Sequence, residues 1–246
     1  IMLLLSELSD NGIPDLAVHP RLEKGTRAWL GAGNGRWTDS SRGFLTEGTC
    51  GGAIQAGDVN NDGNLDLVVA DHCDGIYVYL GDGKGGWQLA TAKLQPEIVR
   101  KNTDPEGNKF AGTEVVAVGD INGDGFLDIV AAASDDGGFA VYLGDGTSKN
   151  WKEVDAGLPN PNRREPASGQ EGGWAMDVQL VDINGDGNLD VVASYYSGPR
   201  VWLGDGKGRF EDRSNGLMKT SLAGIYRRLA IGDIDGDGRL DLAVSN

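Results

Sequence analysis

The segment DVNNDGNLDLVVA, residues 58–70, contains a nine-residue pattern followed by an apolar run. The pattern reads D-x-[N/D]-x-D-G-x-L-D, and its four copies begin at Asp58, Asp120, Asp182 and Asp233. An apolar run follows every copy. Four matches to so specific a pattern are not a coincidence, so we expect a chain built from structural repeats.

Each copy offers a set of oxygen atoms that suits a hard cation. Positions 1, 3, 5 and 9 carry only Asp or Asn, and calcium takes about six to eight oxygen ligands. Glycine at position 6 permits a tight turn, which lets the position-7 carbonyl face the ion. We therefore expect about four calcium ions, one per loop. The expected ligands are Asp58, Asn60, Asp62, Asn64, Asp66; Asp120, Asn122, Asp124, Phe126, Asp128; Asp182, Asn184, Asp186, Asn188, Asp190; and Asp233, Asp235, Asp237, Arg239, Asp241.

Other interpretations of the loop fit its residues less well. An EF-hand needs a glutamate at position 12, where this chain has Val or Ala. Zinc prefers Cys and His, which the loops lack, and magnesium takes fewer protein ligands. A plain turn rich in Asp, Asn and Gly remains the alternative. Mutual repulsion among three carboxylates, and a last aspartate for which a turn has no need, favour the metal site.

The spacing of the loops indicates repeats of one unit. Their first aspartates are 62, 62 and 51 residues apart, and 51 residues before Asp58 stands Glu7. A weakened copy begins there, and its candidate ligands are Glu7, Ser9, Asn11 and Asp15. A second motif, Tyr-Leu-Gly or Trp-Leu-Gly, follows each of the first four loops, at 29–31, 79–81, 142–144 and 202–204.

The pattern of each unit predicts four short strands. In the second unit we expect them at 53–57, 65–70, 76–80 and 87–90, where apolar, β-branched and aromatic residues are bounded by Gly or Asp. Four antiparallel strands repeated radially make a β-propeller. The chain is therefore predicted to be one all-β domain.

The D-x-N-x-D-G-x-x-D loop with its apolar strand, and the V-Y-L-G-D-G turn, resemble FG-GAP/VCBS-type repeats, the calcium-bearing blades also found in the integrin α-chain head. The resemblance covers essentially the whole chain. It implies blades at about 1–44, 45–95, 110–157 and 172–217, with an incomplete one at 225–246. It also implies structural calcium between the first and second strands. Because such propellers commonly have seven blades, the resemblance implies that the chain is part of a longer protein.

Composition narrows the classes of partner. A formal charge of −15 argues against a nucleic-acid partner, which needs basic patches. Four calcium ions would bring the net charge to about −7, so much of the acidity belongs to the loops. We expect no membrane span, because long apolar runs are few.

The two cysteines, Cys50 and Cys73, are predicted to form a disulfide. If Asp58 and Asp66 face each other in an antiparallel pair, the residue numbers of any two paired residues add up to 124. The numbers of the two cysteines add up to 123, so they could lie side by side on adjoining strands. A disulfide is typical of an extracytoplasmic protein, whether secreted, periplasmic or on the cell surface. Two unpaired thiols in a cytosolic protein are the alternative.

Signals for catalysis are weak. The run from Gly81 to Gly86 matches G-x-G-x-x-G, but Trp87 begins a strand where a dinucleotide site needs a helix. His19 and His72 both follow second strands, where we expect surface or turn residues. No catalytic residue is therefore assigned.

The face opposite the calcium loops is the predicted ligand face. It should carry the turn at 71–74 and the long connections 95–112 and 158–173, and long loops on a rigid scaffold often bind partners. The candidate residues are His72, Arg164, Trp174 and Tyr196. We expect a binding module for a protein or a glycan. The alternatives are solvated insertions, a lyase or dehydratase acting on carbohydrate through His72, Tyr196 and Arg164, or an architectural subunit of a surface assembly.

Overall fold

A computed structural model describes residues 3–21, 25–47, 50–90, 94, 112–133, 138–154, 156–159, 175–195, 198–218 and 228–245. All regular elements within these ranges are β-strands, which form four four-stranded sheets and one two-stranded sheet. Within each sheet, strands that follow one another in the chain pair antiparallel. The predicted all-β architecture is confirmed.

We number the sheets as blades one to five. Blade one holds β1 (Leu3–Ser6), β2 (Asp15–Val18), β3 (Arg27–Gly31) and β4 (Trp37–Asp39). Blade two holds β5 (Ile54–Gly57), β6 (Asp66–Asp71), β7 (Gly75–Gly81) and β8 (Trp87–Leu89). Blade three holds β9 (Thr113–Gly119), β10 (Asp128–Ala133), β11 (Phe139–Leu143) and β12 (Lys152–Val154). Blade four holds β13 (Ala175–Val181), β14 (Asp190–Tyr195), β15 (Gly198–Gly204) and β16 (Phe210–Asp212), and blade five holds β17 (Arg228–Gly232) and β18 (Asp241–Ser245).

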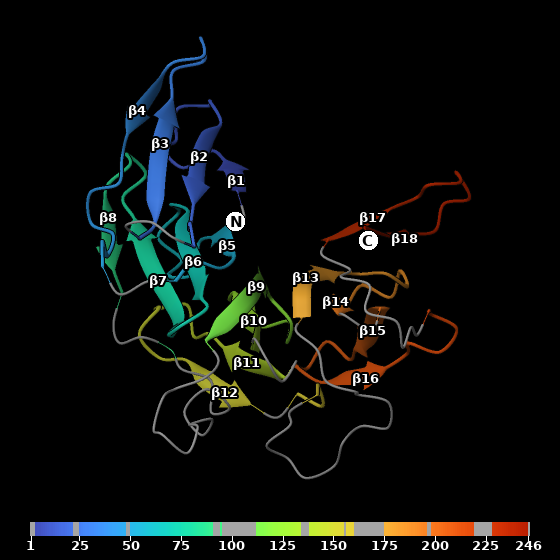
Figure 1. Ribbon diagram of the computed structural model, residues 1–246. Helices are drawn as coiled ribbons and strands as arrows, with labels where there is room; N and C mark the ends of the chain where they lie inside the picture. The colour runs from blue at the N-terminus through green and yellow to red at the C-terminus, as the bar shows by residue number, and fades with distance from the viewer. Residues whose placement is uncertain are drawn as a thin grey trace.

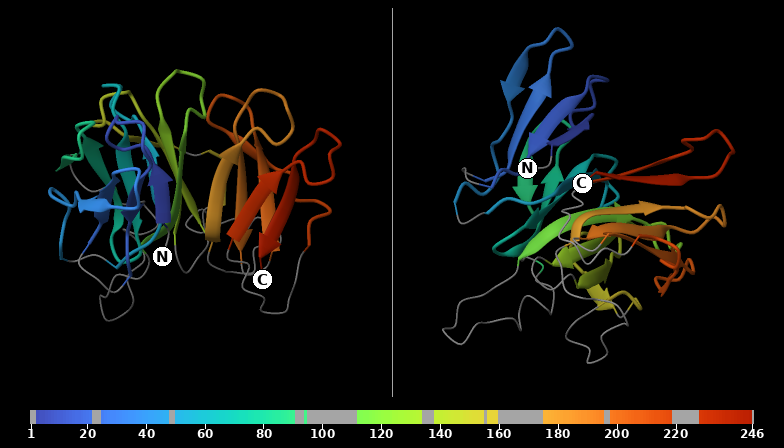
Figure 2. Two further views of the ribbon diagram at one scale, coloured as in Figure 1. Left: turned by 90° about the horizontal axis from the view of Figure 1, so that it is seen from above. Right: turned by 45° about the vertical axis from the view of Figure 1, so that its right-hand side comes forward.

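The blades follow one another around an arc (Figure 1). The first strands of the blades, β1, β5, β9, β13 and β17, line its inner side, and each is a neighbour of the next. The second view in Figure 2 shows blades one and five at the two ends of the arc. Radial stacking of four-stranded units is the arrangement of a β-propeller.

Packing between blades accounts for the sequence of the second strands. Every residue of β6 is buried, because both faces of blade two are covered. Val68 belongs to a core shared with blades three and four, whereas Leu67 and Val69 pack with Ala17 and Ala28 of blade one. A strand buried on both sides reads as a continuous apolar run rather than an alternating one.

The register of blade two differs by one residue from the expected one. Asp66 pairs with Gly57, not with Asp58. Partner numbers along β5 and β6 therefore sum to 123, which is also the sum for the two cysteines. Cys50 and Cys73 form the predicted disulfide, with Cα atoms 5.5 Å apart.

Candidate metal loops and the opposite face

The loop between β5 and β6 is organised by its own side chains. The N–H of Asp62 donates to Asp58 Oδ1 at 3.1 Å and to Asn60 Oδ1 at 3.0 Å. The N–H of Gly63 donates to Asp58 Oδ2 at 2.8 Å, and that of Asn64 donates to Asp62 Oδ1 at 2.8 Å. These bonds hold the side chains of positions 1, 3 and 5, which we call the rim residues, on one side of the turn.

The same pattern recurs in the other three predicted loops. Gly125, Gly187 and Gly238 donate to the position-1 aspartate at 2.8 to 2.9 Å, as Gly63 does. The glycine at position 6 has a positive φ in each loop, +89° at Gly63 and +83° at Gly238, a conformation that favours glycine. The shared geometry shows one turn design repeated in four blades.

The rim residues fit a hard divalent cation. Carboxylate oxygens of Asp233, Asp235 and Asp237 lie within 4.8 Å of one another, and all three residues are exposed. Positions 1 and 5 are also carboxylates in the other three loops, and asparagine supplies an amide oxygen at position 3. An all-oxygen set of this kind matches the preference of calcium.

The last aspartate of each loop has a structural role within its blade. Asp66 is fully buried, and it accepts the Val59 N–H on Oδ2 at 3.0 Å and the Gly81 N–H on Oδ1 at 2.9 Å. It thereby joins the start of the loop to the end of β7. We call this set, one per blade, the anchor aspartates: Asp15, Asp66, Asp128, Asp190 and Asp241.

Burial separates the anchors Asp66 and Asp128 from the rim electrostatically. Loss of solvent raises the pKa of Asp66 and of Asp128 to about 6, although the two backbone N–H donors of each oppose the rise. In the exposed rim, hydrogen bonds from Asn184 and from the backbone of Asn188 hold the pKa of Asp186 below its usual value. Asp66 and Asp128 on one side and Asp186 on the other therefore respond to pH in opposite directions.

The weakened first loop keeps its anchor and its turn. Asp15 is fully buried and accepts the N–H groups of Leu8 and Gly31, each at 2.8 Å. Glu7 accepts the Asn11 N–H, and Asn11 Oδ1 accepts the Ile13 N–H at 2.8 Å. The predicted degenerate site therefore has the turn but a poorer ligand set.

On the opposite face, His72 meets two residues that the sequence did not single out. Its Nδ1 lies 2.7 Å from the Glu114 carboxylate, and Arg21 Nη2 lies 3.2 Å from both His72 and Glu114. These residues come from blades two, three and one in turn. A signal existed for Arg21, because it stands three residues after Val18, as His72 stands three after the equivalent Val69. The other predicted face residues, Arg164, Trp174 and Tyr196, lie outside the described residues.

The expectation that His19 is a surface or turn residue is wrong. His19 is fully buried, with Nδ1 3.1 Å from Thr26 Oγ1 and Nε2 3.0 Å from Asp71. Asp71 also accepts the N–H groups of Cys50 at 2.8 Å and Cys73 at 2.9 Å. This network ties blade one to blade two beside the disulfide, which indicates a structural histidine.

Comparison with known protein families gives a match along nearly the whole chain. The model described as FG-GAP-like repeat matches residues 8–69, 58–131, 120–193 and 182–244. Each match after the first starts at the first aspartate of a loop. The overlapping matches correspond to the repeats that the loops mark.

Curated and solved relatives agree with this assignment. Integrin alpha-4 of Xenopus laevis is 28% identical over 169 residues, which cover 62% of this chain and 15% of that protein. An Agrocybe aegerita lectin that recognises non-reducing terminal N-acetylglucosamine has a TM-score of 0.58 at 21% identity, over 98% of this chain and 59% of the lectin. BBS1N, solved in complex with ARL6DN, has a TM-score of 0.58 at 13% identity, over 98% of this chain and 61% of BBS1N. These structures share the fold. Among the described residues of this chain, no helix is long and apolar enough to cross a bilayer.

Proposed function

Because the chain belongs to the family of FG-GAP-like repeat proteins, we propose that it is a binding module. In this proposal the blades form an extracytoplasmic scaffold, and a protein or glycan partner binds on the face opposite the aspartate loops. The disulfide between Cys50 and Cys73 supports an oxidising compartment.

The cluster of Arg21, His72 and Glu114 is the observation that carries this proposal. Three consecutive blades each place one ionisable side chain at the same point of this face, where Arg21 is 45% and His72 25% exposed. Groups held by different rigid elements keep their positions, which lowers the entropic cost of binding a partner. The names of the relatives favour such a role, since BBS1N was solved with a protein partner and the lectin recognises a sugar.

Calcium is the second part of the proposal. The rim residues and the position-7 carbonyls would hold one ion in each of blades two to five, where the ion would neutralise the clustered carboxylates. The convergence of Asp233, Asp235 and Asp237 supports this. Isothermal titration of chelator-treated protein should find about four calcium ions per chain. A titration without heat, confirmed by a lack of terbium luminescence in the same loops, would reject the calcium sites.

The binding role is testable on glycan and extracellular-protein arrays. We expect at least one array member to bind the wild-type chain, and Arg21→Ala together with His72→Ala to weaken that binding at least tenfold. Lys84→Ala is the matched control, because Lys84 is an exposed cation in the turn between β7 and β8, beside the aspartate loops. Equal losses in both variants would reject the location, and no binding on either array would reject the module.

The contact between His72 and Glu114 also favours a second candidate, a carbohydrate-active enzyme. A histidine held at 2.7 Å from a carboxylate is a usual arrangement for a general acid or base. Incubation with a panel of polysaccharides separates the two functions, because turnover releases new products and binding does not. Product formation that His72→Ala abolishes would establish the enzyme.

A further inference from the structure

A cavity of about 620 Å³ lies among the inner strands of the blades. Its lining comes from β1, β5, β9, β13 and β17. Leu3, Val178 and Leu180 contribute apolar side chains, but polar atoms make up the larger part of the wall, and the polar side chains are those of Gln55, Asp177, Gln179 and Arg228. A cavity of this size in which several polar side chains converge has room for a small, polar molecule.

Two of the polar side chains are held in place by blade five. Asp177 Oδ2 accepts the Leu229 N–H at 3.0 Å, and Gln179 Nε2 donates to the Leu229 carbonyl at 3.1 Å. Both hydrogen bonds go to the edge of β17, so they fix β13 against β17. The Oε1 atom of Gln179 remains available as an acceptor, because its Nε2 makes the bond.

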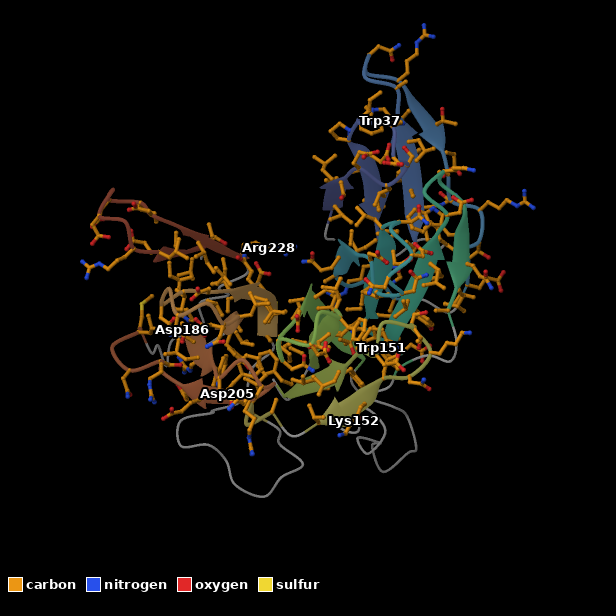
Figure 3. The ribbon with its side chains drawn as sticks, turned by 180° about the vertical axis from the view of Figure 1, so that it is seen from behind. Trp37, Trp151, Lys152, Asp186, Asp205 and Arg228 are labelled. Carbon is orange, nitrogen blue, oxygen red and sulfur yellow. A yellow bond between two sulfur atoms is a disulfide. The ribbon has the colours of Figure 1, made fainter. Side chains whose placement is uncertain are left out.

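Arg228 is placed differently. It is the residue before Leu229 and is exposed, and Figure 3 shows it at the inner end of β17, beside the space that the inner strands enclose. Its guanidinium makes no hydrogen bond or ion pair with any residue that the structure describes, although it attracts Asp177 electrostatically. At the equivalent register, blades two and three carry Ala53 and Val115. Blade four carries Asp177 at the same register, so blade five presents a cation at a level where blades two and three are apolar and blade four is acidic.

Gln55 is the other polar residue of the cavity wall whose side chain does not hold strands together. Its side-chain amide makes no hydrogen bond with the described residues, and it lines the same cavity from β5. The cavity therefore offers one guanidinium and two amide groups that a ligand can use. A planar guanidinium pairs best with a carboxylate, and amides bind hydroxyl groups.

We propose that this cavity binds a sugar acid, a small molecule with one carboxylate and several hydroxyl groups. Arg228 pairs with the carboxylate, Gln55 and Gln179 bind hydroxyl groups, and apolar side chains such as Leu3 and Leu180 pack against the ring carbons. The nearby carboxylate of Asp177 disfavours a second negative charge, which selects against phosphate. This site is separate from the face that binds a macromolecular partner in the proposed function.

Titration calorimetry with D-glucuronate tests the proposal on the full chain. Wild-type protein should bind glucuronate saturably, and glucose and inorganic phosphate at least tenfold more weakly. Arg228→Gln should weaken glucuronate binding at least tenfold. Arg213→Gln is the matched control and should leave it unchanged, because Arg213 is an exposed arginine that pairs with Glu211 outside the cavity.

Gln55→Leu provides a second, independent variant. It should weaken glucuronate binding severalfold while leaving the weaker binding of acetate unchanged, because acetate has no hydroxyl groups. Equal binding by wild type and Arg228→Gln, or no binding by wild type, would overturn the proposal. Phosphate that binds as tightly as glucuronate would overturn the assignment of the ligand class.

Discussion

The first and second aspartate loops have the same turn but different ligand sets, and they separate two functions of one motif. The loop of blade two has a complete rim in Asp58, Asn60 and Asp62, whereas blade one has Glu7, Ser9 and Asn11 at these positions. Both keep the anchor. Asp15 and Asp66 are equally buried, and each accepts one N–H from its own loop and one from the third strand of its blade.

The burial of Asp15 contradicts one expectation from the sequence. A turn without metal was expected to have no need of its last aspartate, yet Asp15 is retained where the rim has degenerated. The reason is that the aspartate satisfies two buried backbone donors, and an unpaired buried donor is costly. The anchor is therefore part of the blade, and the rim is the part of the loop for which we propose a dependence on metal.

Removal of calcium should have the largest effect, and it should spare blade one. Ions held at about a hundred times their dissociation constant contribute about 2.7 kcal/mol each, so chelation should lower the melting temperature by many degrees. Hydrogen exchange should show that the amides of Asp62, Asp124 and Asp186 lose protection in chelator. The amide of Leu8 should not change. An unchanged melting transition would remove the structural role of calcium.

Replacement of an anchor aspartate should have the second largest effect on stability. Asp15→Ala leaves two buried N–H groups unpaired and should cost about 2 to 6 kcal/mol, to the same extent in calcium and in chelator. Asp66→Ala should cost as much in chelator and more in calcium, if Asp66 also contacts the ion. Urea unfolding under both conditions measures this. Asn11→Ala is the control in the same loop, and a loss for Asp15→Ala no larger than for Asn11→Ala would break the distinction.

A single rim substitution should act on one blade. Asp124→Ala should lower the calcium stoichiometry by one ion and cost about 2.7 kcal/mol in calcium at saturating concentration, with little effect in chelator. The matched control is Asn11→Ala, at the same position of the degenerate loop, for which no change in stoichiometry is expected. If Asp124→Ala removed more than one ion, the loops would be coupled rather than independent.

The period of the motifs was enough to predict the blades, because each unit carries its own turn and strand signals. Details that depend on contacts between blades were not predictable. The sequence around His19 indicates a turn residue. Only the packing of two blades places Asp71, which lies 52 residues later, against it. Likewise, Glu114 has no motif, and its link to His72 exists only because β9 lies beside blade two. The one-residue error in register arose because the loop was assumed to pair its own two ends, whereas Gly57 is the partner of Asp66.

The response to pH should distinguish anchor from rim by sign. In chelator, burial raises the pKa of Asp128 to about 6 from 3.8. The stability that this group contributes is therefore fully present below pH 3.8 and is lost as the pH rises through about 6. Asp128→Ala should cost about 2 kcal/mol more at pH 4.5 than at pH 7.5. The rim residue Asp186 has a lowered pKa, so Asp186→Ala should cost more at pH 7.5 than at pH 4.5. Urea unfolding of both variants at the two pH values measures these losses of stability. If the loss changed with pH in the same direction for both variants, the two aspartates would share one environment.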